Sequence, residues 1–313
     1  MLRFQVAAAF AAVYIIWGST YLAIRFVIET LPSFFMAGTR FLTAGVILYA
    51  WMRLRGSSRP ARLHWRSALV VGGLMLLCGH GGVVWAEQWV PSGITSVLIA
   101  TVPLWMVLLD SLRERTRPDT PVVAGIILGF AGVALLVGRV DPSGNSHADL
   151  AGATILVVGA FLWAAGSLYS RSAPSPSSPF LATAMEMIAG GALLLLASFL
   201  TGEWTKIRFD LVSERSLLSW IYLIVFGSLV AFTSYIWLLR VTTTTRVSTY
   251  AYINPIVAMI LGWALASETL TIQNAIAAAI ILASVVTITS RPTKKKSENA
   301  AERKHASDSV NSS

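Results

Sequence analysis

The chain has 313 residues, of which 55% are hydrophobic and only 12% are charged, and its mean hydropathy is +0.68. Soluble proteins carry about twice that charged fraction, so the composition excludes a soluble globular protein and predicts an all-α membrane protein. The net charge is +9, and most of the positive residues lie in short loops between apolar runs. This distribution favours a role of these residues in setting membrane topology over a role in nucleic-acid binding. The single cysteine, Cys78, excludes an internal disulfide and a cysteine-based zinc site.

Apolar runs long enough to cross a bilayer, which takes about 20 residues, recur from one end of the chain to the other. We predict ten transmembrane helices with short connections, so that consecutive helices pack antiparallel. The predicted spans are Phe4–Ile24, Phe34–Met52, Ala68–Trp85, Gly93–Leu112, Pro121–Val137, Leu150–Tyr169, Phe180–Leu200, Leu217–Leu239, Val247–Leu265 and Ile272–Thr289. The polar, Lys-containing segment after Arg291 is typical of a disordered tail.

Positive charges are distributed unevenly between the two sides of this map. Most Lys and Arg residues, including Arg53, Arg113 and Arg246, lie on the side that holds both chain termini, and few lie on the other side. By the positive-inside rule, both termini are therefore predicted to be cytoplasmic.

An internal repeat relates the two halves of the chain, because residues of the same type recur in the same order at a nearly constant separation. The matched pairs are Trp17 and Trp163, Gly45 and Gly191, Trp85 and Trp237, Pro103 and Pro255, and Glu114 and Glu268. We predict two five-helix copies, residues 1–140 and 149–290, followed by a disordered cytoplasmic tail, residues 291–313. Since five is odd, the second copy enters the membrane from the opposite side, and many secondary transporters place their substrate site between such inverted repeats.

Two of the predicted helices contain a proline, Pro103 in the fourth span and Pro255 in the ninth. Pro255 lacks an N–H and clashes with the carbonyl four residues earlier, so its helix is predicted to bend or open near Ala251. Freed backbone groups are tolerated in a bilayer only against protein or a water-filled cavity. We therefore place both helices at the centre of the bundle with the prolines as hinges, although proline kinks are also ordinary in membrane helices.

Ionisable residues inside spans are functional candidates, and Arg40, Glu186 and His80 are the candidates for ion coupling. Counted from opposite membrane faces, Arg40 and Glu186 differ in depth by about 10 Å, so a direct ion pair requires helix tilt. Local hydrogen bonding of each is the alternative. His80 is a group that titrates near neutral pH, or else a hydrogen-bonded core residue. Glu87 lies close to a span end and is predicted to be solvated.

A central cavity is predicted to bind the substrate through aromatic rings and a polar kinked helix. The candidate substrate-binding residues are Trp17, Ser19, Thr20, His80, Trp163, Tyr252 and Asn254. Aromatic side chains would bind apolar parts of a solute, and Asn254 its polar end. Interface anchoring and close helix packing are the competing explanations for the tryptophans. The sequence contains no metal-ligand cluster, nucleophile constellation or phosphate-binding loop, so we predict no metal, no cofactor and no enzymatic activity.

Several short motifs are distributed over both halves of the chain. They are Tyr14–Tyr21, Arg40-Phe41, Val90–Gly93, Ala100–Leu104, Gly166-Ser167, and Ser248–Pro255 followed by Glu268–Leu270. Together these motifs resemble the EamA-type exporters of the drug/metabolite transporter superfamily, in particular its bacterial YedA-like branch. The resemblance implies ten helices in two inverted repeats, a bacterial inner membrane, and a central cavity lined by the first, third, fourth, sixth, eighth and ninth helices.

The function expected from this resemblance is secondary transport by alternating access, with export of small organic metabolites such as amino acids, related compounds or drugs. The expected partners are a small-molecule solute and the lipid bilayer, with no nucleic acid. An integral membrane enzyme and a passive metabolite channel are the alternatives. A channel would present a ring of polar groups along one path.

The ten-span map predicts the location of two points on the chain. A reporter fused after Thr289 should be cytoplasmic, and a reporter inserted in Asp141–His147 should be external. Reporter activity or labelling in intact cells measures both. A cytoplasmic reporter at Asp141–His147 would rule out the map.

Overall fold

The computed structural model describes residues 2–113, 115, 120–137, 146–269 and 271–289, which form helices and short connections with no strand among them. The chain is thus an all-helical protein, as its composition predicts. The helices are α1 (Leu2–Ile28), α2 (Ser33–Leu54), α3 (Arg62–Val71), η1 (Gly72–His80), α4 (Gly81–Ala86), α5 (Ser92–Ile99), α6 (Val102–Arg113), α7 (Thr120–Val137), α8 (Ser146–Ser172), α9 (Pro179–Leu200), η2 (Glu203–Lys206), η3 (Phe209–Leu211), α10 (Glu214–Tyr222), η4 (Leu223–Phe232), α11 (Thr233–Val241), α12 (Thr244–Val247), α13 (Tyr250–Ala266) and α14 (Ile272–Thr289). The predicted tail, residues 291–313, lies outside the described residues.

Within the described residues, seven helical stretches are long and apolar enough to cross a membrane. They are Arg3–Ile28, Ser33–Leu54, Arg62–Ala86, Ser92–Arg113, Leu150–Ser172, Pro179–Leu200 and Glu214–Val241. Three shorter apolar helices, Val123–Leu135, Ile253–Ala266 and Ile272–Thr287, coincide with the remaining predicted spans. The multi-span architecture is therefore confirmed, whereas the count of ten stays a prediction.

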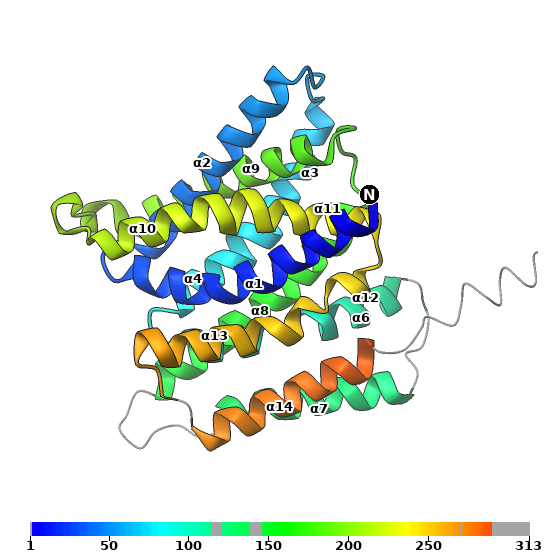
Figure 1. Cartoon of the computed structure of the whole chain (residues 1–313), viewed down its shortest axis with the longest axis vertical. Coiled ribbons are helices and arrows are strands. Elements are labelled where there is room, and N and C mark those ends of the chain that lie inside the picture. Colours follow the sequence, from blue (N-terminus) through cyan, green and yellow to red (C-terminus); the bar gives the residue numbers. More distant parts are fainter. Residues whose placement is uncertain (1, 114, 116–119, 138–145, 270, 290–313) are drawn as a thin grey trace, which may run out of the picture.

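Contacts between helices recur in pairs across the molecule. Helix α2 packs along α9 at one end of the structure, and α7 packs along α14 at the other (Figure 1). Between these pairs, α1 packs on α13 and on η4, and α8 packs correspondingly on α5 and α6 and on η1. These contacts of α1 and of α8 correspond to one another when the two halves are exchanged.

Two of the long helices contain π-helical stretches, which the sequence analysis did not predict. The stretch η1 lies between α3 and α4, and η4 lies between α10 and α11. They occupy equivalent places in the two halves, since α9 packs on η1 and α2 packs on η4. Such stretches are rare in helices and are frequent at functional sites, because they alter the direction of the following side chains.

Both predicted proline hinges lie near a break in the helix. Helices α5 and α6 are separated at Ala100–Thr101, directly before Pro103. Helices α12 and α13 are separated at Ser248–Thr249, and Pro255 lies inside α13. The interruption in the ninth predicted span therefore falls slightly before Ala251, which is the position that the proline alone predicted.

Two glutamates of the second half hold the ends of helices in the first half. The Glu203 carboxylate accepts hydrogen bonds from the backbone N–H groups of Phe34 (3.2 Å) and Phe35 (2.8 Å) at the start of α2. The Glu268 carboxylate accepts from the N–H groups of Ser92 (2.8 Å) and Gly93 (3.1 Å) at the start of α5. A carboxylate at a helix N-terminus satisfies unpaired donors and complements the helix dipole.

Glycines allow α2 and α9 to pack backbone against backbone. A Cβ on Gly45 would lie 2.8 Å from the amide nitrogen of Ile188, and a Cβ on Gly191 would lie 2.6 Å from that of Leu42. Small residues at helix interfaces are the usual means of such close approach within a membrane. The repeated Gly45 and Gly191 therefore have a shared packing role at one interface.

Gly191→Ala should destabilise this interface, because backbone atoms must move to admit the methyl group. Overpacking of this kind typically lowers the free energy of unfolding by about 1–3 kcal/mol. The control is Gly73→Ala, where the nearest atom to the added Cβ would be a Leu193 methyl carbon at 3.6 Å. The unfolding midpoint in detergent should fall for Gly191→Ala only, and equal midpoints would contradict the assigned packing.

Candidate functional site

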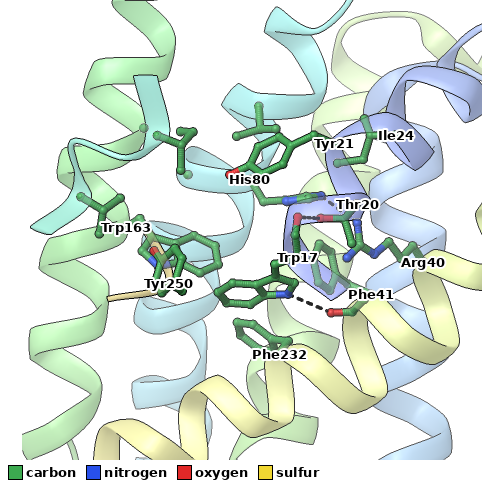
Figure 2. A pocket seen from close by; sticks show the side chains of 16 residues that line it. Trp17, Thr20, Tyr21, Ile24, Arg40, Phe41, His80, Trp163, Phe232 and Tyr250 are labelled. Carbon is green, nitrogen blue, oxygen red and sulfur yellow. Dashed lines mark hydrogen bonds between the residues drawn. The ribbon is translucent and has the colours of Figure 1, made fainter. Parts of the chain in front are cut away.

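A cavity lies at the centre of the bundle and encloses about 590 Å³ of space between protein atoms, part of it open to the surroundings. Its lining residues are Trp17, Thr20, Tyr21, Ile24, Arg40, Phe41, Gly79, His80, Val83, Ile99, Val102, Gly159, Trp163, Gly227, Phe232 and Tyr250. They come from α1, α2, η1, α4, α5, α6, α8, η4 and α13, so both halves contribute (Figure 2). Four of the predicted binding residues, Trp17, Thr20, His80 and Trp163, are brought together here.

Four aromatic rings from four helices pack together at the cavity, and we call Trp17, Trp163, Tyr235 and Tyr250 the aromatic cluster. All of them except Tyr235 line the cavity. Ring centroids in the cluster are 4.9 Å apart for Trp17 and Tyr235 and 5.4 Å apart for Trp17 and Tyr250. The Trp17 and Trp163 rings meet edge to face at 5.6 Å. Such contacts join α1, α8, α11 and α13 without a salt bridge, and edge-to-face pairs add about 0.5–1.5 kcal/mol to the burial of the rings.

Hydrogen bonds hold the polar edges of the aromatic cluster. The Trp163 indole N–H donates to the Tyr235 hydroxyl at 3.1 Å, and that hydroxyl also bonds the Ser167 hydroxyl at 2.9 Å. The Trp17 indole N–H donates to the backbone carbonyl of Gly227 at 3.2 Å. Tyr235 is fully buried, so its partners within the protein replace water.

Arg40 and His80 meet at the wall of the cavity, near Trp17 (Figure 2). The Arg40 Nε donates to the Ser228 hydroxyl at 2.8 Å, and its Nη1 lies 3.2 Å from His80 Nε2. Because a guanidinium only donates, His80 Nε2 is the acceptor and the ring proton sits on Nδ1. The Arg40 guanidinium also packs over the Phe41 ring at 4.7 Å.

Two predicted binding residues, Ser19 and Asn254, are not among the cavity lining. Ser19 bonds the Tyr222 hydroxyl at 2.6 Å, which joins α1 to α10. With its amide nitrogen facing them, Asn254 donates to the carbonyl oxygens of Tyr14 (2.9 Å) and Tyr250 (3.2 Å), and so fastens α13 to α1. The side chain of Tyr252 lies outside the described part of the structure.

Glu186 and Arg40 do not form an ion pair. The only ion pair among the described residues joins Arg208 and Asp210 in an exposed loop. Glu186 is buried on α9 beside a separate small hollow lined also by His64 and Ser170, and its Oε2 has no hydrogen-bond partner in the described part of the chain. Local bonding, the alternative considered from the sequence, holds for Arg40.

Glu87 corrects the sequence analysis, which predicted a solvated side chain. It directly follows α4 and is fully buried, and neither carboxylate oxygen has a hydrogen-bond partner among the described residues. The backbone N–H of Val90 bonds back to Ala86, which folds the connection over the helix end, and Arg25 of α1 donates to the Glu87 carbonyl oxygen. The sequence feature that pointed to this contact is Arg25, which is one of the few basic residues on the sparsely charged side of the predicted map.

Comparison with known proteins identifies a transporter family. Residues 5–138 and 150–290 each match the EamA-like transporter family. The chain is 40% identical over 283 residues to the protein named uncharacterized inner membrane transporter YedA of Escherichia coli strain K12, covering 90% of this chain and 89% of that protein. It is 22% identical to the protein named uncharacterized transporter YoaV of Bacillus subtilis strain 168, covering 88% and 94%.

The overall fold also matches a solved crystal structure with a TM-score of 0.65 and 20% sequence identity. The match covers 91% of this chain and 97% of that one. It shows a shared fold alone. Together with the several apolar helices, the relative named as an inner membrane transporter supports a multi-pass inner membrane protein with a transport role.

Tyr235→Phe tests the hydrogen bonds of the aromatic cluster. The change keeps the ring but leaves the Trp163 indole N–H unpaired, which should lower the free energy of unfolding by about 1–3 kcal/mol. In Tyr49→Phe, the control, the lost hydroxyl makes no hydrogen bond within the described residues, so the change should stay within about 0.5 kcal/mol. Thermal unfolding of both variants in detergent measures the difference, and equal midpoints would argue against the bonded arrangement.

Proposed function

Because the chain belongs to the EamA-like transporter family, we propose that it is a secondary transporter that exports small organic metabolites by alternating access. Amino acids and related compounds are the expected solutes, and drugs are a further class. The observation that carries this proposal is the central cavity, whose lining residues come from both regions that match the family. A cavity between two such regions has the position that transporters use for substrate.

The proposed topology is ten spans in two inverted five-helix repeats, residues 1–140 and 149–290, with both termini cytoplasmic. Three observations support it: the family matches twice along the chain, the helix contacts recur in pairs, and the stretches η1 and η4 occupy equivalent places. The three shorter apolar helices support the proposal, because each coincides with one of the three remaining predicted spans.

Alternating access needs a closure on each side of the cavity. We assign the cytoplasmic closure to the aromatic cluster, supported by the bond between Tyr14 and Thr249 and by Asn254. The contact of Arg25 with Glu87 is assigned to the external closure, because Arg25 follows Trp17 by about 12 Å along α1. Breaks beside Pro103 and before Pro255 then supply the hinges.

Within the cavity, Trp17 and Trp163 would stack on apolar parts of the solute, and Thr20 and His80 would bond its polar groups. Tyr252 stays a candidate on the same helix as Tyr250. Ser19 and Asn254 act in this scheme by fastening α1 to its neighbours, because each already bonds residues of another helix.

Counterflow in proteoliposomes tests transport against the passive-channel alternative. Vesicles preloaded with unlabelled solute from a panel of amino acids and related compounds should transiently accumulate the labelled solute above its equilibrium level. A channel gives equilibration without this overshoot. Absence of an overshoot for every solute that crosses the membrane would overturn the alternating-access proposal.

Proton coupling is tested on the same vesicles, with Glu186 and His80 as proposed proton carriers and Arg40 as the charge beside His80. If proton antiport drives export, Glu186→Gln or His80→Gln should abolish the pH dependence of transport and leave counterflow intact. Each substitution keeps a hydrogen-bonding group but removes the titrating one. Unchanged pH dependence in both variants would remove these two residues from the mechanism.

A further inference from the structure

Arg40 carries a buried positive charge that forms no direct ion pair with a carboxylate of the described residues. The side chain is 2% exposed, and no Asp or Glu oxygen among those residues lies within 4.0 Å of it, since the recorded ion pair is Arg208–Asp210. Arginine does not lose its proton in proteins, and an unpaired charge in a low-dielectric interior is unfavourable. The Arg40 guanidinium therefore has no directly paired carboxylate among the described residues, and an anionic ligand in the cavity would supply one.

The guanidinium has unused hydrogen-bond donors in the cavity. Of the five N–H groups that arginine offers, the Nε bond to Ser228 and the Nη1 bond to His80 are the hydrogen bonds found in the described part of the chain. None is found there for Nη2. A planar guanidinium binds a carboxylate most strongly through two parallel N–H bonds, and Nη1 and Nη2 together present such an edge.

The cavity wall is shaped around this guanidinium. A Cβ added to Gly227 would lie 2.7 Å from Arg40 Nη2, so a larger residue here would displace the guanidinium from its present position. Gly227 lies in the π-helical stretch η4, and its carbonyl is the acceptor for the Trp17 indole N–H. The same residue thus admits the cation on one side and holds an aromatic ring of the cavity on the other.

We infer that the Arg40 guanidinium binds an anionic group of the transported solute, a carboxylate or a group of similar geometry. The inference rests on the proposed transport function and specifies its substrate class. Trp17, Trp163 and Phe232 line the same cavity, so the apolar part of the solute packs against rings while its anionic end faces Arg40. His80 accepts from Arg40 through Nε2 and thereby orients the guanidinium.

Binding of two matched probes tests the inference on the purified full chain in detergent. The probes are 3-phenylpropionate, which is anionic at neutral pH, and its neutral analogue 3-phenylpropanamide, which has the same ring and chain. Hydrogen bonds to charged groups favour the carboxylate, so its dissociation constant should be about tenfold lower or more. An amide that binds as tightly as the carboxylate, or a carboxylate with no binding at millimolar concentration, overturns the inference.

Variants separate Arg40 from other positive charges. Arg40→Gln should abolish the preference for the carboxylate, and Arg40→Lys should keep part of it. Arg208→Gln, in which an exposed arginine is lost, should leave the preference unchanged. Gly227→Ala crowds the Arg40 Nη2 without changing the charge, so it should reduce the preference for the carboxylate. This variant replaces Arg40→Gln as the test if Arg40→Gln does not fold.

The possible outcomes distinguish a failure of the anion site from a failure of the proposed transport function. A preference that persists in Arg40→Gln overturns the anion site and leaves transport standing. A preference that depends on Arg40 but occurs without counterflow supports the site and overturns the proposed transport.

Discussion

Polar groups placed within a bilayer must find their partners inside the protein, and much of this structure follows from that constraint. The buried starts of α2 and α5 present amide groups without partners in their own helix, and the carboxylates of Glu203 and Glu268 accept hydrogen bonds from them. Each carboxylate comes from the second matched region and each helix from the first. The need to satisfy backbone donors therefore also ties the two regions together around the cavity.

The same constraint explains why the cavity wall is aromatic and tied by hydrogen bonds. Trp163, Tyr235 and Ser167 pair their polar atoms with one another, so helices α8 and α11 meet without exposing an unpaired donor. Ring contacts between helices are weak individually and have no fixed register, unlike backbone packing at Gly45 and Gly191. Helices joined by rings are thus suited to separation and reformation, whereas α2 and α9 are suited to remain a rigid pair.

The sequence predicts the helical class and the approximate spans well, because apolar runs and prolines are local signals. It also points to Trp17 and Trp163 through the repeat, and these rings do meet. It misses the contact of Arg40 with His80, which depends on the rotation of two helices and on the π-helical stretch before His80. It misplaces Glu87, because burial at a helix end depends on how the next connection folds. The break at Ser248–Thr249 similarly changes which face of α13 meets the cavity, so Tyr250 lines it.

An anionic solute would change the energetics of export. The bacterial interior is electrically negative, and moving one elementary charge through 100 mV corresponds to about 2.3 kcal/mol. For a monoanion leaving the cell this term is favourable and supports a concentration ratio of about 50-fold without a coupling ion. A fixed cation such as Arg40 that stays near the cavity centre while the closures alternate does not cross the membrane, so the net charge moved is that of the solute. Under this arrangement the membrane potential alone drives export, and proton coupling through Glu186 or His80 would add to that driving force.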